Sequence, residues 1–197
     1  MRRIGLFAED FGHEEVLKAL LEERFGPEYR VDVQVKGYSV RGGYGAVESE
    51  FKRYVHELES HRAELPDLII VATDSNCAGY VERRKRMHGA AGSIQHAVAY
   101  AIPDPHVERW LLLDSAAFKK VLGQACTAPD LKCNRDRYKK LLIDAIRETG
   151  TSPLLGGMEH AREIVRYMDL DRLRKSDKSF GALLEELHAR FRRWASA

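Results

Sequence analysis

Acidic side chains follow two of the most apolar runs in the sequence. Glu9 ends the run at 3–9 (RIGLFAE) with Asp10 directly after it, and Asp74 comes directly after the run at 67–73 (DLIIVAT). If both runs are neighbouring parallel strands, they lie about 4.8 Å apart, so these carboxylates can converge on one ion. Mg²⁺ prefers oxygen ligands and usually keeps several waters, so two or three carboxylates and a substrate phosphate suffice. The sequence therefore predicts a Mg²⁺ or Mn²⁺ site that assists displacement at phosphorus.

Two further oxygen donors lie close to these acids in the chain. Asn76 stands two residues beyond Asp74, in a turn that asparagine tolerates, and Glu14 lies one turn into the first predicted helix. The predicted metal ligands are therefore Glu9, Glu14, Asp74 and Asn76. A structural role is the alternative, because loops begin after strands and helices favour acids in their first turn.

Alternating strand and helix patterns must position these acids. Apolar runs predict strands at 3–9, 30–35, 67–73 and 96–102, and periodic apolar faces predict helices at 13–25, 47–64, 80–88 and 107–122. Strands that alternate with helices of this length indicate an α/β fold with a Rossmann-like, mainly parallel sheet flanked by helices. In such sheets functional groups collect beyond the carboxyl ends of the strands.

The last 70 or so residues are typical of helices alone, at 135–149, 158–168 and 179–194, with a Gly- and Pro-rich loop at 150–157. We therefore predict an α/β core over residues 1–123 and a helical C-terminal extension over 124–197 that packs on it. The segment 39–45 (SVRGGYG) is predicted to be a flexible loop. It is not expected to follow a strand and open a helix, as a dinucleotide-binding loop does. The sequence has no GxxxxGK[ST] motif, so the chain is not expected to bind ATP by itself.

The composition predicts a cytoplasmic protein without a membrane segment. No apolar run approaches the roughly 18–20 residues that span a bilayer, and Glu9 interrupts the N-terminal apolar stretch too early for a signal peptide. The three cysteines, Cys77, Cys126 and Cys133, have no CxxC spacing, which argues against a disulfide framework and a structural zinc site. They are therefore predicted to be reduced, partly buried thiols. The eight histidines have no tight metal-ligand spacing either.

Positive charge is concentrated toward the C-terminus. From Lys119 onward Lys and Arg outnumber Asp and Glu by 17 to 11, whereas before it they are outnumbered by 15 to 19. A metal site with a phosphate-holding flank would have this distribution. Lys132, in the basic stretch 132–140, is predicted to approach a scissile phosphate. Four cations soon after Asp74 are predicted to hold nucleic-acid phosphates, although such a run is also typical of a solvated helix face: Arg83, Arg84, Lys85 and Arg86.

Three motifs resemble the Toprim domain, the fold shared by topoisomerases, primases and the nucleases of the overcoming-lysogenization-defect group. The first is 7–15 (FAEDFGHEE), and the second is 69–76 (IIVATDSN). The stretch 102–114 (IPDPHVERWLLLD) is similar to a Glu-x-Trp-Leu-Leu-x-Asp pattern of small stand-alone Toprim-like proteins encoded beside an ATPase in bacterial defence loci. The tail at 167–180 is also similar to the C-terminal pattern of that family.

The resemblance implies a Mg²⁺-dependent nuclease acting on DNA or RNA, the effector of an ATPase-linked anti-phage defence system with an ATPase as partner protein. Self-association into a homo-oligomer is left open. The resemblance also implies that Glu9 is a general base or metal ligand, Asp74 a metal ligand and Glu108 an additional acid. Two residues depart from the family: Asp10 replaces the usual Gly, and Asn76 replaces a second Asp and so removes one charge from the metal site.

Two other hypotheses stay open. A receiver-like domain would be phosphorylated at Asp74, but it needs a Lys at the end of a fifth strand, which we do not find. A catalytically degenerate Toprim fold would only bind a partner protein or nucleic acid, and Asn76 favours it. Trp110 is predicted to pack in the core, and Asp114 is either a salt-bridge partner or a ligand.

Overall fold

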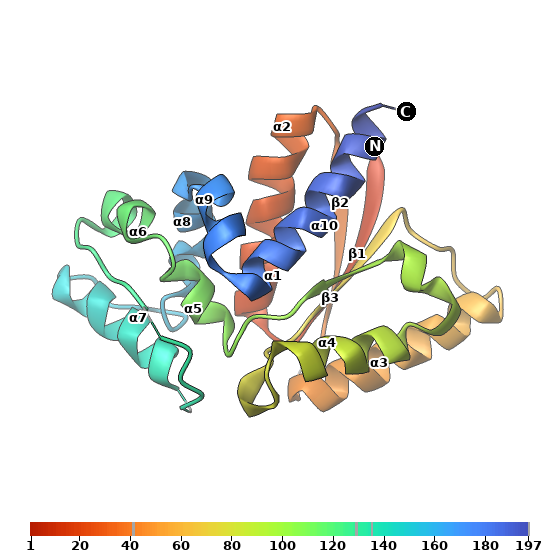
Figure 1. Cartoon of the computed structure of the whole chain (residues 1–197), viewed down its shortest axis with the longest axis horizontal. Helices are drawn as coiled ribbons and strands as arrows, with labels where there is room; N and C mark the ends of the chain where they lie inside the picture. The colour runs from red at the N-terminus through yellow and green to blue at the C-terminus, as the bar shows by residue number, and fades with distance from the viewer. Residues whose placement is uncertain (41, 129, 135, 197) are drawn as a thin grey trace.

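Four short strands form one parallel sheet in the computed structural model, which describes residues 1–40, 42–128, 130–134 and 136–196. The strands are β1 (Arg2–Ala8), β2 (Val33–Ser39), β3 (Leu68–Ala72) and β4 (Val98–Ala101). Their order in the sheet is β2-β1-β3-β4, and every pair of neighbours is parallel. Figure 1 labels the first three strands and the helices that surround them. The predicted α/β class with a parallel sheet flanked by helices is confirmed.

The register of the sheet brings three strand ends to one level. Ala8 of β1 is paired with Ala72 of β3, and Ala72 is paired with Ala101 of β4. The ladder continues for one more residue, because the Glu9 amide donates to the Ala72 carbonyl at 3.0 Å and the Thr73 amide donates to the Ala101 carbonyl at 3.1 Å. The loops after β1, β3 and β4 therefore begin at the same edge of the sheet.

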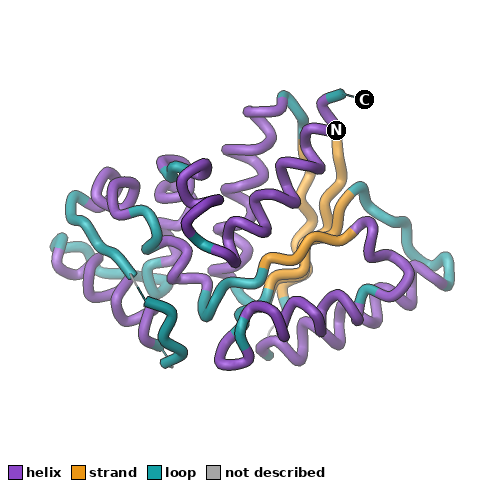
Figure 2. Tube along the Cα trace, viewed as in Figure 1, coloured by secondary structure: helices purple, strands orange, loops and turns teal. Residues whose placement is uncertain are grey.

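Helices cover both faces of this sheet (Figure 2). Between β1 and β4 they are α1 (Phe11–Ala19), the π-helical turn η1 (Leu20–Phe25), α2 (Gly26–Tyr29), α3 (Gly43–Glu59), the 3-10 turn η2 (Asn76–Ala78), α4 (Tyr80–Ala90) and the 3-10 helix η3 (Gly92–Ala97). After β4 they are α5 (Val107–Leu111), α6 (Ser115–Leu122), α7 (Arg137–Glu148), the 3-10 turn η4 (Met158–His160), α8 (Ala161–Tyr167), α9 (Leu170–Ser176) and α10 (Lys178–Ala195). None of the described helices is both long and apolar enough to cross a membrane.

Side chains that alternate along the strands form two hydrophobic clusters. Phe7 and Val71 pack with α3 and α4 on one face, whereas Leu6 and Ile70 pack with α1 and the C-terminal helices on the other. All five residues of β3 are fully buried, as expected for a strand covered on both faces. Burial of each large apolar side chain stabilises the fold by about 1.5–3 kcal/mol, so this sheet is a rigid platform for the residues at its edge.

The C-terminal helices share the larger cluster with the sheet. Trp110 is 1% exposed, lies 4.6 Å from the Phe180 ring between centroids, and donates from its indole nitrogen to the Ser179 hydroxyl at 2.9 Å. The prediction that Trp110 packs in the core is confirmed. Asp114 is structural, because its carboxylate accepts from the amides of Ala116 and Ala117 and caps α6.

Several predicted boundaries were wrong for local reasons. The helix predicted at 13–25 is followed without a break by α2, which ends at Tyr29, because proline is tolerated in the first turn of α2. Arg30 then takes a left-handed conformation with φ 54°, so the second strand begins at Val33 rather than at residue 30. The predicted helix 107–122 is divided at the Asp114 cap, and α9 was not predicted. Arg135, the first residue of the helix predicted at 135–149, lies outside the described residues.

The glycine-rich segment 39–45, which was predicted to be a flexible loop, lies partly within regular structure. It follows β2 and opens α3 at Gly43, although neither was expected from the sequence. Gly42 and Gly43 have φ values of 131° and 74°, which L side chains rarely adopt. Arg41 of this segment lies outside the described residues. The predicted loop at 150–157 is confirmed.

Candidate active site

The first turn of α1 holds a buried histidine between two acids. Asp10 is the N-cap of the helix, and its carboxylate accepts from the His13 amide at 3.0 Å and contacts His13 Nδ1 at 2.8 Å. His13 is 1% exposed, and its Nε2 lies 3.1 Å from Asp74 Oδ1, an ion-pair contact rather than a well-aligned hydrogen bond. The loops after β1 and β3 are thus joined through one imidazole ring.

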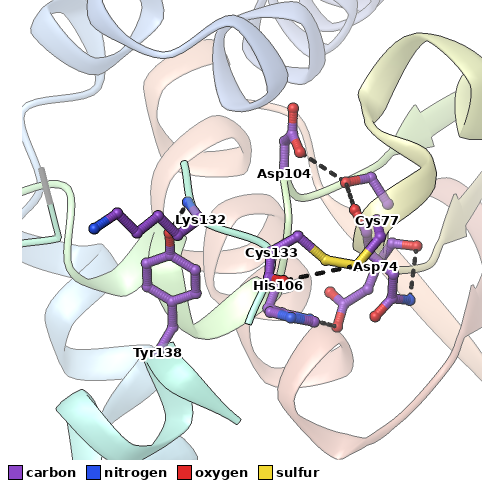
Figure 3. Close-up of a disulfide and its surroundings, with 9 residues drawn as sticks. Asp74, Cys77, Asp104, His106, Lys132, Cys133 and Tyr138 are labelled. Atoms are coloured by element: carbon purple, nitrogen blue, oxygen red, sulfur yellow. Dashed lines mark hydrogen bonds and ion pairs between the residues drawn. A yellow bond between two sulfur atoms is a disulfide. The ribbon is translucent and has the colours of Figure 1, made fainter. Parts of the chain in front are cut away.

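Asp74 is enclosed by three donors from two segments, α1 and the start of α5. Besides the His13 contact, its Oδ2 lies 3.0 Å from His106 Nδ1, and its Oδ1 accepts from the Val107 amide at 2.9 Å at the start of α5. The Asp74 side chain is only 14% exposed. Figure 3 shows Asp74 and His106 turned toward each other. We call Asp10, His13, Asp74 and His106 the acid–histidine network.

Mutual charge stabilisation shifts all four groups of this network. Burial alone would raise the pKa of Asp10, but the hydrogen bond and charge of His13 lower that pKa to about 2. Burial would lower the pKa of His13, but the charges of Asp74 and Asp10 raise it well above its usual value. The hydrogen bond to Asp74 raises the pKa of His106, and the two histidines keep the pKa of Asp74 low against the effect of burial. Within the network the carboxylates therefore favour the protonated forms of the imidazoles, and the imidazoles favour the charged forms of the carboxylates.

Glu9 joins the ends of β1 and β3. Its Oε2 accepts from the Thr73 hydroxyl at 2.5 Å and from the Asp74 amide at 3.1 Å. The other oxygen, Oε1, lies 3.6 Å from where a Cβ on Gly43 would stand. Glu9 and Asp74 are thus adjacent, as the sequence predicted, but Glu9 meets the backbone of Asp74, whereas the Asp74 carboxylate faces the histidines.

Glu108 differs from the other acids of this edge. Burial raises its pKa, and the negative charge of Asp74 raises it further. Glu108 lines a cavity of about 190 Å³ together with Asp10, Phe11 and Lys139. A carboxyl group with a raised pKa in a cavity is a candidate proton donor.

A second, larger cavity of about 560 Å³ has carboxylates on one wall and glycines on the other. Its lining residues are Glu9, Asp10, Phe11, Glu14, Val40, Gly42 and Gly43. The glycines belong to the loop that opens α3, and the N-terminus of a long helix favours negative charge. We call this space the carboxylate cavity. It can accommodate a cation at the acids and a phosphate near the helix.

The predicted metal ligands do not share one preformed site. Within the described ranges, no three or more His, Cys, Asp or Glu residues are arranged to hold a metal ion. Glu9 and Glu14 line the carboxylate cavity, and Glu14 also pairs with Lys18 at 2.6 Å. Asn76 has a left-handed backbone with φ 49°, and its side-chain nitrogen Nδ2 lies 3.5 Å from the backbone carbonyl oxygen of Asp74.

Most of the predicted phosphate-binding cations have protein partners. Arg83 is buried, and its guanidinium lies 3.7 Å from the centroid of the Tyr44 ring. Arg84 pairs with Glu186 at 2.6 Å, and Arg86 pairs with Glu48 at 2.5 Å. Lys85 is exposed. Lys132 is also exposed, lies 3.6 Å from Asp130, and points away from Asp74 in Figure 3. Of the basic stretch 132–140, Lys139 is the residue that lines a cavity with Glu108.

Both histidines of the network and a disulfide were not predicted from the sequence. The spacing Asp10-x-x-His13 at a helix start is a signal that could have identified His13, because a capping side chain faces the residue three positions on. His106 gave no such signal, since it meets Asp74 only through the parallel register of β3 and β4. Cys77 and Cys133 form a disulfide, so the prediction of reduced thiols was wrong for this pair.

Comparison with known proteins matches the chain to a family model. The domain of unknown function DUF4276 matches residues 8–188, which include both cavities and the whole acid–histidine network. No curated protein and no solved structure matches the chain.

Proposed function

The chain belongs to the DUF4276 family, and from the geometry of its own residues we propose that it is a divalent-cation-dependent nuclease with its reacting centre at the carboxyl edge of the sheet. The observation that carries this proposal is the carboxylate cavity, where Glu9, Asp10 and Glu14 face the glycine-opened N-terminus of α3. Both features suit metal-assisted cleavage, because carboxylates attract the cation and main-chain amides attract the phosphate.

The cation would be held by oxygens of Glu9 and its neighbours in the carboxylate cavity. One or two carboxylates with waters and substrate phosphate oxygens are a common set for Mg²⁺, so a preformed cage of protein ligands is not required. When bound, the ion neutralises phosphate charge and makes the phosphorus easier to attack. Asp74 is not counted as a direct ligand, because both of its oxygens already contact protein donors.

The chain's own residues supply positioning and a proton. The acid–histidine network fixes the loops after β1, β3 and β4 against one another, so that Glu9 and Glu108 keep their relative places. Glu108, with its raised pKa, is the group that would donate a proton to the departing oxygen. Lys139 lies in the same cavity and would offset the charge of a bound strand.

Nucleic acid as substrate and an ATPase as partner are further parts of the proposal. They rest on the resemblance of 7–15, 69–76 and 102–114 to Toprim-like proteins, and Glu9, Asp74 and Glu108 stand at the positions that the resemblance marks. Arg83, Arg84 and Arg86 contribute less to substrate binding, because each already has a protein partner.

A binding module without catalysis is the second candidate. Two features favour this candidate, because each reduces the negative charge available to a metal. The Asp74 carboxylate is enclosed by protein donors, and residue 76 has a neutral amide side chain in place of a carboxylate. The receiver-like alternative has less support, since an Asp74 carboxylate held by two histidines and the Val107 amide has no oxygen directed outward to accept a phosphoryl group.

The test is a cleavage assay with the full chain on plasmid, single-stranded DNA and transfer RNA, with Mg²⁺, with Mn²⁺ and with a chelator. We expect cation-dependent cleavage that Glu9→Gln abolishes and that Glu108→Gln slows by roughly 10²–10⁴-fold, the usual contribution of a general acid. Glu163→Gln, at an exposed site on α8, is the matched control and keeps full activity.

Two results would count against the proposal. Cleavage that survives Glu9→Gln would place the activity elsewhere. Tight nucleic-acid binding with no cleavage under any cation would favour the non-catalytic module instead.

A further inference from the structure

A disulfide joins two segments that meet beside the acid–histidine network. Cys77 lies in η2, three residues after Asp74, and Cys133 lies in the connection between α6 and α7, 56 residues further along the chain. Figure 3 shows the bond together with Asp74, His106 and Tyr138. The disulfide therefore couples the loop that carries Asp74 to a segment of the C-terminal half.

The loop on the Cys77 side is firmly held. The Ser75 amide donates to the Pro103 carbonyl at 2.9 Å, and the Ser75 hydroxyl donates to Asp104 at 2.9 Å. The Asn76 amide donates to the Pro105 carbonyl at 3.0 Å. These bonds fix the loop after β3 to the loop after β4 whether or not the disulfide is present.

The segment on the Cys133 side, residues 130–134, is held mainly at its beginning. The Asp130 carbonyl accepts from Arg109 at 3.0 Å and from the Tyr138 hydroxyl at 2.8 Å, and the Lys132 amide donates to the same hydroxyl at 2.9 Å. Asn134 makes local backbone bonds, donating to Lys132 and accepting from Arg137. Leu131 and Lys132 are both more than half exposed. Among the described residues, the disulfide is thus the strongest attachment of the later part of this segment to the sheet edge.

One of the two residues that form the bond lies at the surface of the molecule. Cys77 is exposed and Cys133 is half-buried, and accessible disulfides are the ones that are commonly labile. The third cysteine, Cys126, is free, and burial raises the pKa of its thiol, so it is a poor competitor as an attacking thiolate.

We propose that Cys77 and Cys133 form a reversible thiol–disulfide modification site, in which the oxidised pair anchors residues 130–134 against the loop that carries Asp74 and the reduced pair releases them. The reductant is a dithiol. Its thiolate attacks the exposed Cys77 sulfur, a mixed disulfide forms, and the Cys133 thiolate leaves and takes a proton. The second thiol of the reductant then displaces the Cys77 thiolate, which is protonated. Two electrons pass to the pair, and the reductant becomes a disulfide.

Release of this segment would change the surroundings of the site. The Tyr138 ring, whose hydroxyl holds Asp130 and Lys132, also lies 6.2 Å from the His106 ring between centroids. His106 in turn contacts Asp74. The path from the disulfide to the network is therefore short, and the inference holds whether or not the chain is a nuclease.

The experiment uses the full chain under native conditions, titrated with dithiothreitol and with its oxidised form. Cysteines are alkylated and mapped by mass spectrometry, and amide hydrogen exchange is measured on the same samples. We expect Cys77 and Cys133 to become alkylated together on reduction and to be protected again on reoxidation, without unfolding. Peptides that cover residues 130–134 should lose exchange protection on reduction, while those of β3 should not.

Matched variants separate the pair from the remaining thiol. Cys126→Ser should keep the whole response. Cys77→Ser should show rapid exchange at 130–134 from the start and no further change with dithiothreitol. Reduction that requires denaturant would show a purely structural disulfide and overturn the modification site. Reversible reduction with unchanged exchange at 130–134 would overturn the anchoring role.

Discussion

The two ends of β3 each carry an aspartate, and the two carboxylates are in different situations. Asp67, at the amino end, pairs with Arg2 at 3.2 Å and accepts from the Arg3 amide at 2.8 Å, and both partners of the ion pair remain about one-third exposed. Asp74, at the carboxyl end, is enclosed by His13, His106 and the Val107 amide. The same strand thus ends in a surface ion pair on one side and in a buried charge network on the other.

The cavities likewise differ in whether the charges near them are exposed or buried. One cavity, about 650 Å³, lies between β1, β2 and α3 and is lined by Tyr38, Tyr54 and surface charges such as Arg3 and Glu64, which pair at 2.8 Å. The carboxylate cavity is smaller, at about 560 Å³, but adjoins the buried network. Volume alone therefore does not identify the site. Buried charges that perturb one another, at the edge where parallel strands end, are the better indicator.

The largest expected difference between the two ends comes from the buried histidine. His13→Gln removes a positive charge that lies between Asp10 and Asp74, so the free energy of unfolding should fall by about 3–5 kcal/mol. Urea unfolding monitored by circular dichroism measures this loss. A decrease below about 1 kcal/mol would mean that the network stabilises the fold no more than a surface pair does.

The disulfide gives the next largest effect. Under oxidising conditions Cys77→Ser should lower the free energy of unfolding by about 2–4 kcal/mol, because the bond closes a long loop in the unfolded chain. With reductant present, wild type and variant should unfold at nearly the same urea concentration. Cys126→Ser, the control, should behave like wild type in both conditions.

The pH dependence should distinguish the two ends by its sign. The pKa values of His13 and His106 are raised in the folded protein, so both groups contribute to its stability. This contribution is complete below the unfolded-state pKa of about 6.5, and it is lost as the pH rises through the folded-state pKa values. On the alkaline side, the free energy of unfolding of the wild type should therefore fall by up to about 1.4 kcal/mol per pH unit for each proton that is released. His13→Gln should show a flatter alkaline limb, and an unchanged limb would contradict the assignment.

The smallest effect belongs to the amino end. Asp67 has a lowered pKa, so its contribution is present above its unfolded-state pKa of about 3.9 and is lost only as pH falls. Asp67→Asn should lower the free energy of unfolding by about 0–1 kcal/mol at neutral pH. The fall in stability on the alkaline side should be the same as in the wild type. A loss as large as that of His13→Gln would remove the contrast between the two ends.

The sequence predicted the acids of the site better than the groups that hold them. Apolar runs followed by Glu9 and Asp74 indicated parallel strands with acids at one edge, because strand periodicity is a local property. His106 reaches Asp74 only after β3 and β4 are paired, so no local pattern could assign it. The same holds for Cys77 and Cys133, which the fold brings together across 56 residues.

Boundary errors had a related origin. Arg30 in the left-handed conformation shifted β2 by three residues, and the Asp114 cap divided a predicted helix into α5 and α6. Both depend on a single side chain or backbone angle rather than on the average pattern of a window. The opening of α3 at Gly43 was missed because glycines usually indicate loops, whereas here Gly42 and Gly43 supply the positive φ values with which the chain enters the helix.

Cation binding to the carboxylate cavity underlies the proposed nuclease activity, and it can be measured by Mn²⁺ titration with paramagnetic broadening of backbone amide resonances as the signal. We predict selective broadening of amides in residues 10–14 and 42–46, with little effect around the 650 Å³ cavity. Glu9→Gln should weaken binding by at least about tenfold, whereas Glu163→Gln should not. Broadening that is centred on the larger cavity, or that is unchanged by Glu9→Gln, would contradict the proposed cation site.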